Sequence, residues 1–413
     1  MLVTKSGSQI RKVGNFQANQ RMLAQECDFY GFDLDRNRRH IVGRECVVQG
    51  HHFNSKLQQI IEEATAIDGY GLYTDTACSV FASQLGDNLD RSQTTQQQWQ
   101  YCASLYAMLG YGRLDVSRVD DGIVTAKTSH FVEGRRTSSL DETKPVCSMT
   151  TGFLRGAHFA VTGETVDVCE VECALMGAQE CKFETLPCDG PPPTMYRKRE
   201  VDGLSSQEAL SPQPYSSIDE AAIVDALVGM PIHGDGLIPA FNVYLASTPV
   251  DFYILLTHRF IEAMDAKGLG DIARLQLTHV GEIGTLNMFR GVRNSIEWNE
   301  LIAPMISAPQ DEFDAMVAVI NGLGWGRWRV TDIVPGSAAV LETSNGFESI
   351  GYEQLIDDIE RPTCYMSTGI ATALFELTYG QGTPHDLFGL ADGLECQCRG
   401  AEHEVCQFLV KSI

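Results

Sequence analysis

Two stretches in the second half of the chain place apolar residues at helical spacing. The first, VDFYILLTHRFIEAM, begins at Val250 and follows Ser247-Thr248-Pro249, which offers a hydroxyl cap and a proline near the first helical position. The second, DEFDAMVAVINGLG, begins at Asp311 and ends on two glycines, which suit a helix C-terminus. The pattern therefore predicts two helices, the first of them capped just before Pro249.

A different pattern, in which apolar and β-branched residues alternate with polar ones, follows the second of these helices. GRWRVTDIVPGSAAVLETSNG reads as a β-hairpin that turns at Pro335-Gly336, and GRLDVSRVDDGIVTAKTSHF in the first half reads as a similar hairpin that turns at Asp120-Asp121-Gly122. Each hairpin is followed by a segment typical of a helix with a threonine cap, TGFLRGAHFAVTG or TGIATALFELTYG, and then by a last hairpin. These elements predict an α+β fold, with helices packed on an antiparallel sheet.

The order of these elements is repeated along the chain. MLGYGRLDVSRVDDG matches GLGWGRWRVTDIVPG, and CSMTTGFLRGAHFA matches CYMSTGIATALFEL further on. Between the halves lies a segment rich in proline, serine and charge, after which SIDEAAIVDALVGM resumes a helical pattern with Ser217 as its expected cap. We therefore expect two copies of one fold, at residues 1–186 and 218–413, joined by a linker at residues 187–217 that is partly extended and partly flexible.

Each half ends with the same set of three cysteines and one glutamate. Both sets contain the spacing E-x2-C-x7-C, and both are preceded by a further cysteine at the start of the expected helix. The members are Cys147, Glu170, Cys173 and Cys181 in the first half, and Cys364, Glu395, Cys398 and Cys406 in the second. Three thiolates and a carboxylate suit tetrahedral Zn²⁺. Because buried cysteines are also common without a metal, it is the repetition of the whole set that favours two structural zinc sites.

Composition limits the possible classes of function. The chain has 413 residues, a formal net charge of −23 and no apolar run long enough to span a membrane. The acidity and the lack of a basic stripe argue against direct nucleic-acid binding, since the single basic cluster, Arg197-Lys198-Arg199, is short and lies in the linker. The N-terminus has no secretory signal and the 13 cysteines are an odd number, so we expect a reducing, cytoplasmic location in which metal binding is favoured over disulfides.

The cysteine pattern, followed by C-[KQ]-F and preceded by the LG-[YW]-G-R hairpin, resembles the 4-vinyl reductase domain. It is also similar to the zinc-containing sensor domain of phenol-responsive activators. The resemblance implies a fold shared with a vesicle-tethering subunit of the TRAPP type, a structural zinc ion, and a hydrophobic pocket near the metal. The second copy departs from the pattern by an insertion between Tyr379 and Pro384. The chain has no G-x4-G-K-[ST] motif, so we do not expect it to drive transcription as those activators do.

The resemblance predicts a binding or sensor protein for a small hydrophobic ligand, either aromatic or tetrapyrrole-like. The candidate ligand-binding residues are Tyr111, Trp325 and Trp328 beside the glycine turns, and His158 on the helix between Cys147 and Glu170. Large aromatic residues also dominate protein cores, so a purely structural role for them is the alternative.

Two other functions remain open from the sequence. A metal-dependent enzyme, of the mononuclear iron or reductase type, would use His258, His279 and Glu282 as a two-histidine, one-carboxylate triad. Against the triad, VGEIGTLN is rich in glycine, which disfavours the helix that would place His279 and Glu282 on one face, and the first half has no matching set. His51 and His52 in the first half are another candidate pair, but adjacent residues on one element would point apart. A non-catalytic scaffold, with a protein partner or as a homo-oligomer, is the third possibility.

Overall fold

The computed structural model describes residues 2–3, 9–12, 30–137, 145–199, 201, 210, 216–230, 232–357, 362–401 and 403–413. Within these ranges the protein is a mixture of helices and antiparallel sheets, as the sequence predicts. The linker prediction is covered only in part, because residues 200, 202–209 and 211–215 lie outside the described ranges. No helix in the described ranges is long and apolar enough to cross a membrane.

The elements of the first half begin with strands. They are β1 (Leu2–Val3), β2 (Gln9–Lys12), β3 (Tyr30–Asp33), β4 (Arg38–Ile41), β5 (Arg44–Gly50), α2 (His51–Glu62), α3 (Gly69–Asn88), α4 (Thr95–Met108), η1 (Val119–Asp121), β6 (Ile123–Ala126), α5 (His130–Thr137), α6 (Ser148–Thr162), β7 (Val166–Glu172), η2 (Ala174–Met176) and β8 (Cys181–Pro187).

From its second strand onward, the second half has a series of elements similar to that of the first half. Its elements are α7 (Glu220–Val228), β9 (Ile238–Ala240), β10 (Val243–Pro249), α8 (Val250–Asp265), α9 (Gly270–Arg293), η4 (Trp298–Ile302), η5 (Ala303–Met305), α10 (Pro309–Gly322), β11 (Trp328–Val334), β12 (Ala338–Thr343), α11 (Phe347–Leu355), α12 (Tyr365–Tyr379), α13 (Pro384–Leu387), β13 (Ala391–Gln397), η6 (Arg399–Ala401) and β14 (Cys406–Ser412).

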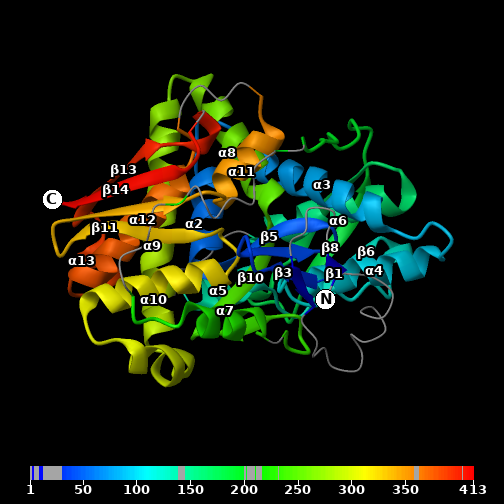
Figure 1. The fold of residues 1–413 in the computed structure, drawn as a ribbon. Helices are drawn as coiled ribbons and strands as arrows, with labels where there is room; N and C mark the ends of the chain where they lie inside the picture. The colour runs from blue at the N-terminus through cyan, green and yellow to red at the C-terminus, as the bar shows by residue number, and fades with distance from the viewer. Residues whose placement is uncertain are drawn as a thin grey trace.

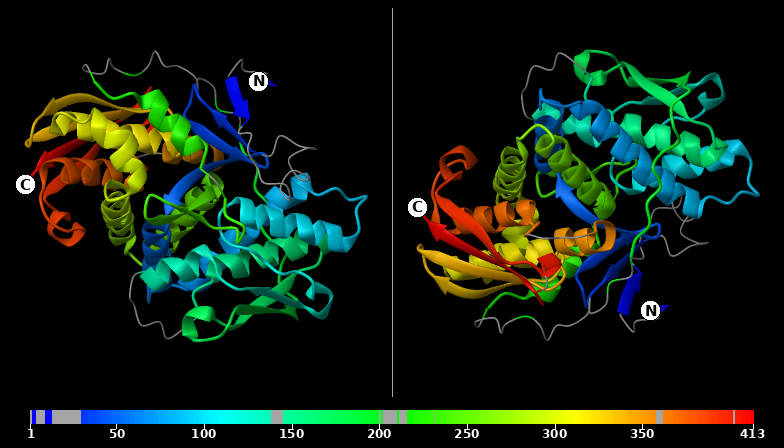
Figure 2. Two further views of the ribbon diagram at one scale, coloured as in Figure 1. Left: turned by 90° about the horizontal axis from the view of Figure 1, so that it is seen from below. Right: turned by 90° about the horizontal axis from the view of Figure 1, so that it is seen from above.

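Three sheets organise these elements. A seven-stranded sheet has the order β1-β2-β3-β4-β5-β10-β9, and two smaller sheets have the orders β6-β8-β7 and β11-β12-β14-β13. The smaller sheets lie at opposite ends of the molecule with the seven-stranded sheet between them (Figures 1 and 2). Within each end, α3 packs on α6 and α9 packs on α12, while α2 packs on α9 and α3 on α8 across the centre.

The strands β5 and β10 join the two halves. Each has seven residues and leads directly into a helix, so Gly50 corresponds to Pro249 and Cys46 to Leu245. The antiparallel ladder pairs Gly50 with Leu245 and Cys46 with Pro249, and it pairs Val48 with its own counterpart, Ser247. The pairing is therefore symmetric about Val48 and Ser247.

Main-chain hydrogen bonds to the neighbouring helices repeat this symmetry. Val48 N donates to Leu323 O at the end of α10, at 3.0 Å, and Ser247 N donates to Leu109 O at the end of α4, at 2.7 Å. Each bond crosses from one half of the chain to the other. Strands β5 and β10 thus each hold the C-terminal end of a helix of the opposite half.

Several local predictions were wrong. Ser247 and Thr248 belong to strand β10, and Pro249 has the extended φ and ψ of the residue before α8, so this helix has no side-chain hydroxyl cap. Asp219, whose side chain accepts from Ala222 N, caps α7, where Ser217 was expected. In the first half, β6 pairs with β8, and its expected partner strand is reduced to the single bridge between Asp115 and Thr125.

The helices before the last hairpin of each half also begin earlier than expected. Cys147 and Cys364 are the residues at their N-caps, so the threonines that were expected as caps lie inside α6 and α12. Another difference concerns VGEIGTLN, which is helical throughout as part of α9. A Cβ atom at Gly281 would stand 2.0 Å from Met366 O of α12, so this helix contains glycine because two helices approach closely there.

Candidate metal centres and ligand site

The two cysteine and glutamate sets come together as compact clusters at the ends of the molecule. In the second half, ligand atoms of all four predicted residues, Cys364, Glu395, Cys398 and Cys406, lie within 4.8 Å of one another. The first half brings Cys147, Glu170 and Cys181 within the same distance. Its fourth predicted member, Cys173, is also buried but is not in the group whose ligand atoms lie within that distance.

The backbone positions these groups in the same way in both halves. The first cysteine stands at the N-cap of a helix, and its main-chain N–H donates to the glutamate: Cys147 N to Glu170 Oε2 and Cys364 N to Glu395 Oε2, each at 3.0 Å. The register of the hairpin shifts by one residue directly after each glutamate. A bulge of this kind re-aims the side chains of the strand, here toward the cysteine turn.

A tight turn then supplies the remaining thiols. After Cys173 the chain forms η2, and Ala174 N donates to Cys181 Sγ at 3.3 Å. After Cys398 it forms η6, and Arg399 N donates to Cys406 Sγ at the same distance. The thiols of the first and last cysteine are 3.8 Å apart in one cluster and 3.7 Å apart in the other.

The electrostatics of the clusters fit a bound cation. Burial raises the pKa of Glu170 to about 7 and that of Glu395 to about 9, because each carboxylate is held among thiols with little solvent. In both glutamates the second oxygen, Oε1, is buried without a hydrogen-bond partner. A divalent cation bound by the carboxylate and the three thiolates would satisfy that oxygen and offset the buried negative charge.

The predicted ligand-binding aromatics lie in the core. Tyr111, Trp325 and Trp328 are almost fully buried, and their polar atoms are bonded within the protein. The Tyr111 hydroxyl donates to Thr248 Oγ1 at 2.9 Å, and Trp325 Nε1 donates to Val48 O at 2.7 Å, each across the boundary between the halves. Trp328 stacks on Phe408 at 5.0 Å. Their part in ligand binding stays a prediction, and this packing favours a structural role.

His158 has a different environment. Its ring lies edge-on to Trp99 of α4, with ring centroids 6.2 Å apart, and its Nε2 atom is buried without a hydrogen-bond partner. Burial lowers the pKa of His158, so the neutral imidazole is favoured. The residue therefore presents a free polar atom beside an aromatic ring inside the first half.

The three residues of the alternative iron triad are not assembled into a site. His258 Nε2 lies 3.4 Å from Glu262 on its own helix, the His279 ring packs against Phe388, and Glu282 Oε1 accepts from Gly389 N. Among the described residues, the triad is not one of the groups whose ligand atoms lie within 4.8 Å of one another. The geometry therefore does not support an iron centre formed by these residues.

The sequence did not indicate a buried polar chain where the two halves meet. Asn54 Nδ2 lies 3.0 Å from His130 Nε2, and Asn54 Oδ1 accepts from the Tyr253 hydroxyl at 2.6 Å. Close by, Tyr244 N donates to His51 Nδ1, and the other ring nitrogen of His51 lies 2.9 Å from Thr137 Oγ1. Isolated polar residues in apolar stretches carry no signal of this arrangement, because their partners come from distant segments.

Comparison with known proteins agrees with the position of the first cluster. A search of curated proteins finds no match. Among solved structures, the chain is similar to the phenol-responsive sensory domain of the transcription activator PoxR with phenol, at 17% sequence identity and a TM-score of 0.36 over 42% of this chain and 92% of that chain. Residues 136–187, which include all four members of the first cluster, match the family model of the 4-vinyl reductase domain.

Proposed function

We propose that this chain is a zinc-containing sensor or carrier of a small hydrophobic, aromatic molecule, built from two copies of a 4-vinyl-reductase-like domain. One observation carries the proposal: the family match spans all four residues of the first set, three of which lie within 4.8 Å of one another, and the second half brings all four of its residues together on a similar helix and hairpin. The symmetric β5–β10 ladder supports reading the two halves as fused partners.

In this proposal both zinc ions are structural. Cys147, Glu170, Cys173 and Cys181 would hold one ion and Cys364, Glu395, Cys398 and Cys406 the other. Four protein ligands leave no open coordination position for a substrate, so the metal contributes stability and fixes the hairpin against its helix. Residues other than the metal ligands would then bind the small molecule.

The first half is the better candidate for binding the ligand. His158 offers its unpartnered Nε2 next to Trp99, which suits a flat molecule with a hydroxyl group. In the repeat alignment the corresponding residues of the second half are Phe375 and Phe313, both buried and without polar side-chain atoms. We propose that the first half recognises a phenol-like molecule and that the second half serves as its folded partner.

The test compares two matched variants of the full-length chain. His158→Phe installs the residue of the second half, and Phe375→His makes the reciprocal change. We expect phenol and small alkylphenols to raise the melting temperature of the wild type by mass action, and His158→Phe to abolish this shift while the zinc content is unchanged. If no phenolic compound stabilises the wild type, the sensor proposal fails and a scaffold is favoured.

A further inference from the structure

The basic cluster in the linker has a defined place in the structure. Residues 191–199, which we call the strap, run from the first half to the second without forming a helix or strand. Lys198 Nζ lies 2.5 Å from Asp251 Oδ1, and the Tyr196 hydroxyl donates to Asp251 Oδ2 at 2.7 Å. Arg199 N donates to Gln354 O at 2.9 Å, and the Arg199 side chain pairs with Asp357. The strap is thus fixed to the second half at two places.

Asp251 is the main anchor of the strap. It lies in the first turn of α8 and its side chain is fully buried. Arg44 Nε, at 3.8 Å, is its partner from the first half. Two of the groups that compensate this buried charge therefore belong to the strap. Release of the strap would leave the carboxylate with Arg44 alone, which is costly for a desolvated charge. The contacts with Asp251 therefore stabilise the strap in its observed position, and they are noncovalent.

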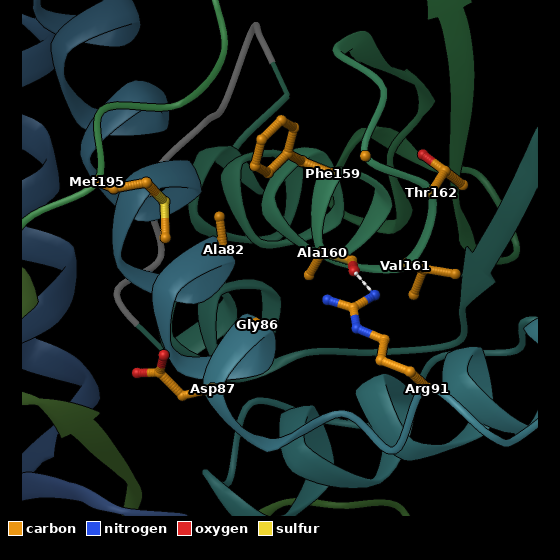
Figure 3. Close-up of a pocket in the computed structure, with 10 residues that line it drawn as sticks. Ala82, Gly86, Asp87, Arg91, Phe159, Ala160, Val161, Thr162 and Met195 are labelled. Carbon is orange, nitrogen blue, oxygen red and sulfur yellow. Dashed lines mark hydrogen bonds between the residues drawn. The ribbon is translucent and has the colours of Figure 1, made fainter.

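Directly before Tyr196, the strap residue Met195 forms part of one wall of a pocket. The pocket has a volume of about 450 Å³ and lies where the C-terminal turns of α3 and α6 approach each other. Figure 3 shows the Met195 side chain of the strap near Ala82, with the Phe159 ring on the neighbouring wall. The remaining lining residues are partly small or apolar and partly polar: Gly86, Ala160, Val161, Gly163, Asp87, Arg91 and Thr162.

Both charged side chains of this pocket already have partners. Arg91 Nη1 donates to Ala160 O at 2.6 Å (Figure 3), and Asp87 forms an ion pair with Arg44 at 2.7 Å. Asp87 is therefore neutralised by Arg44, whereas Arg91 donates to a neutral carbonyl and keeps its positive charge beside the pocket. The Phe159 ring, the Met195 thioether and the small side chains suit the faces of a flat aromatic body.

We propose that this pocket is a second binding site, distinct from His158, for a flat aromatic molecule, and that the strap is its movable wall. Its volume is within the range of small-molecule pockets. Because Met195 immediately precedes Tyr196, a ligand that presses against Met195 acts on the anchor at Asp251. Occupation of the pocket is thereby linked to the contact between strap and second half, which gives binding in one half an effect on the other.

The experiment uses full-length, zinc-loaded protein and naphthalene as the probe, because naphthalene has no hydroxyl group to bind His158. Gly86→Trp is the blocking variant, because a Cβ atom at Gly86 meets no atom within 4 Å and the new side chain can enter the pocket. Ile272→Trp, at a half-exposed site on α9, is the matched control. Isothermal titration calorimetry measures the affinity of each protein for the probe. Amide hydrogen exchange in residues 191–199 reports on the mobility of the strap.

We expect saturable binding of naphthalene to the wild type and to Ile272→Trp, with an affinity at least about tenfold lower for Gly86→Trp. Bound naphthalene should change exchange within residues 191–199, and Tyr196→Phe should speed exchange there while the zinc content is unchanged. Equal affinity of Gly86→Trp and wild type overturns the pocket, and an unaltered strap overturns the movable wall. His158→Phe should not affect this site, so its failure and that of the phenol site can be told apart.

Discussion

The buried histidine where the two halves meet should make stability depend on pH in a way that one substitution removes. His130 is 1% exposed, and burial lowers its pKa to about 3. Its Nε2 faces the amide of Asn54, while its Nδ1 is buried without a partner. The folded protein therefore keeps the neutral imidazole, since a second proton would be buried with no group to accept from it.

The sign of the effect follows from the two pKa values. In the unfolded chain His130 titrates near its ordinary value of about 6.5, whereas in the folded protein it stays neutral until the pH falls to about 3. Above pH 6.5 both states are neutral and the stability is complete. As the pH falls below 6.5 only the unfolded state gains the proton, so stability is lost. Between pH 7 and pH 5 the loss amounts to about 2 kcal/mol.

His130→Phe is the perturbation that isolates this loss. Phe347 occupies the corresponding position in the second half: His130 N donates to Tyr111 O, and Phe347 N donates to Trp325 O. Buried glutamates with raised pKa values, such as Glu348, titrate in the same range with the opposite sign, so the difference between variant and wild type is the informative quantity. Relative to wild type, the variant should be about 2 kcal/mol more stable at pH 5 than at pH 7.

Urea unfolding followed by circular dichroism at half-unit steps between pH 5 and pH 7.5 measures this difference. His385→Phe, an exposed site on α13, controls for the general effect of replacing a histidine by phenylalanine. A difference between His130→Phe and wild type that stays constant across the range would refute the reasoning, because it would mean that His130 titrates alike in both states.

Three further outcomes are expected. Elemental analysis should find about two zinc ions per chain, and Cys398→Ser should lose about one of them together with thermal stability, since a structural metal contributes its binding energy to folding. Trp325→Ala should lower the free energy of unfolding by about 3–5 kcal/mol because it leaves a cavity and an unpaired Val48 carbonyl, and Trp325→Phe should cost less; equal costs would contradict this. Residues 216–413 expressed alone should self-associate through the exposed edge of β10, and a monomeric product in analytical ultracentrifugation would count against it.

The cysteine and glutamate clusters were the part of the structure that the sequence predicted best. Their ligands are close in sequence on one hairpin, and only Cys147 and Cys364 come from outside it. Local spacing alone therefore identifies most of each cluster. The bulge after each glutamate could not be predicted, because a one-residue shift in register leaves no mark on a short alternating pattern.

The central sheet was missed for a physical reason. Strand β10 ends in Ser247-Thr248-Pro249 and passes into α8 with no turn residue, so its last residues have the composition of a helix cap. Its pairing partner, β5, lies far away in sequence. Helical glycines such as Gly281 were misread for the same reason, because the close approach of α12 that favours them is a tertiary contact.

The symmetry of the β5–β10 ladder brings counterpart residues of the two proposed copies next to each other. In the proposed duplication, residues close to the axis contact their own counterparts: Val48 pairs with Ser247, and Asn54 accepts a hydrogen bond from Tyr253. A substitution there changes the surroundings of both copies at once, so a polar group introduced on one side needs a partner on the other. The hairpins that contain the two cysteine and glutamate clusters lie at opposite ends of the molecule, so no contact of this kind obliges one cluster to follow the other (Figure 1). That both halves nevertheless have three cysteines and a glutamate supports the proposal that each half binds its own metal ion.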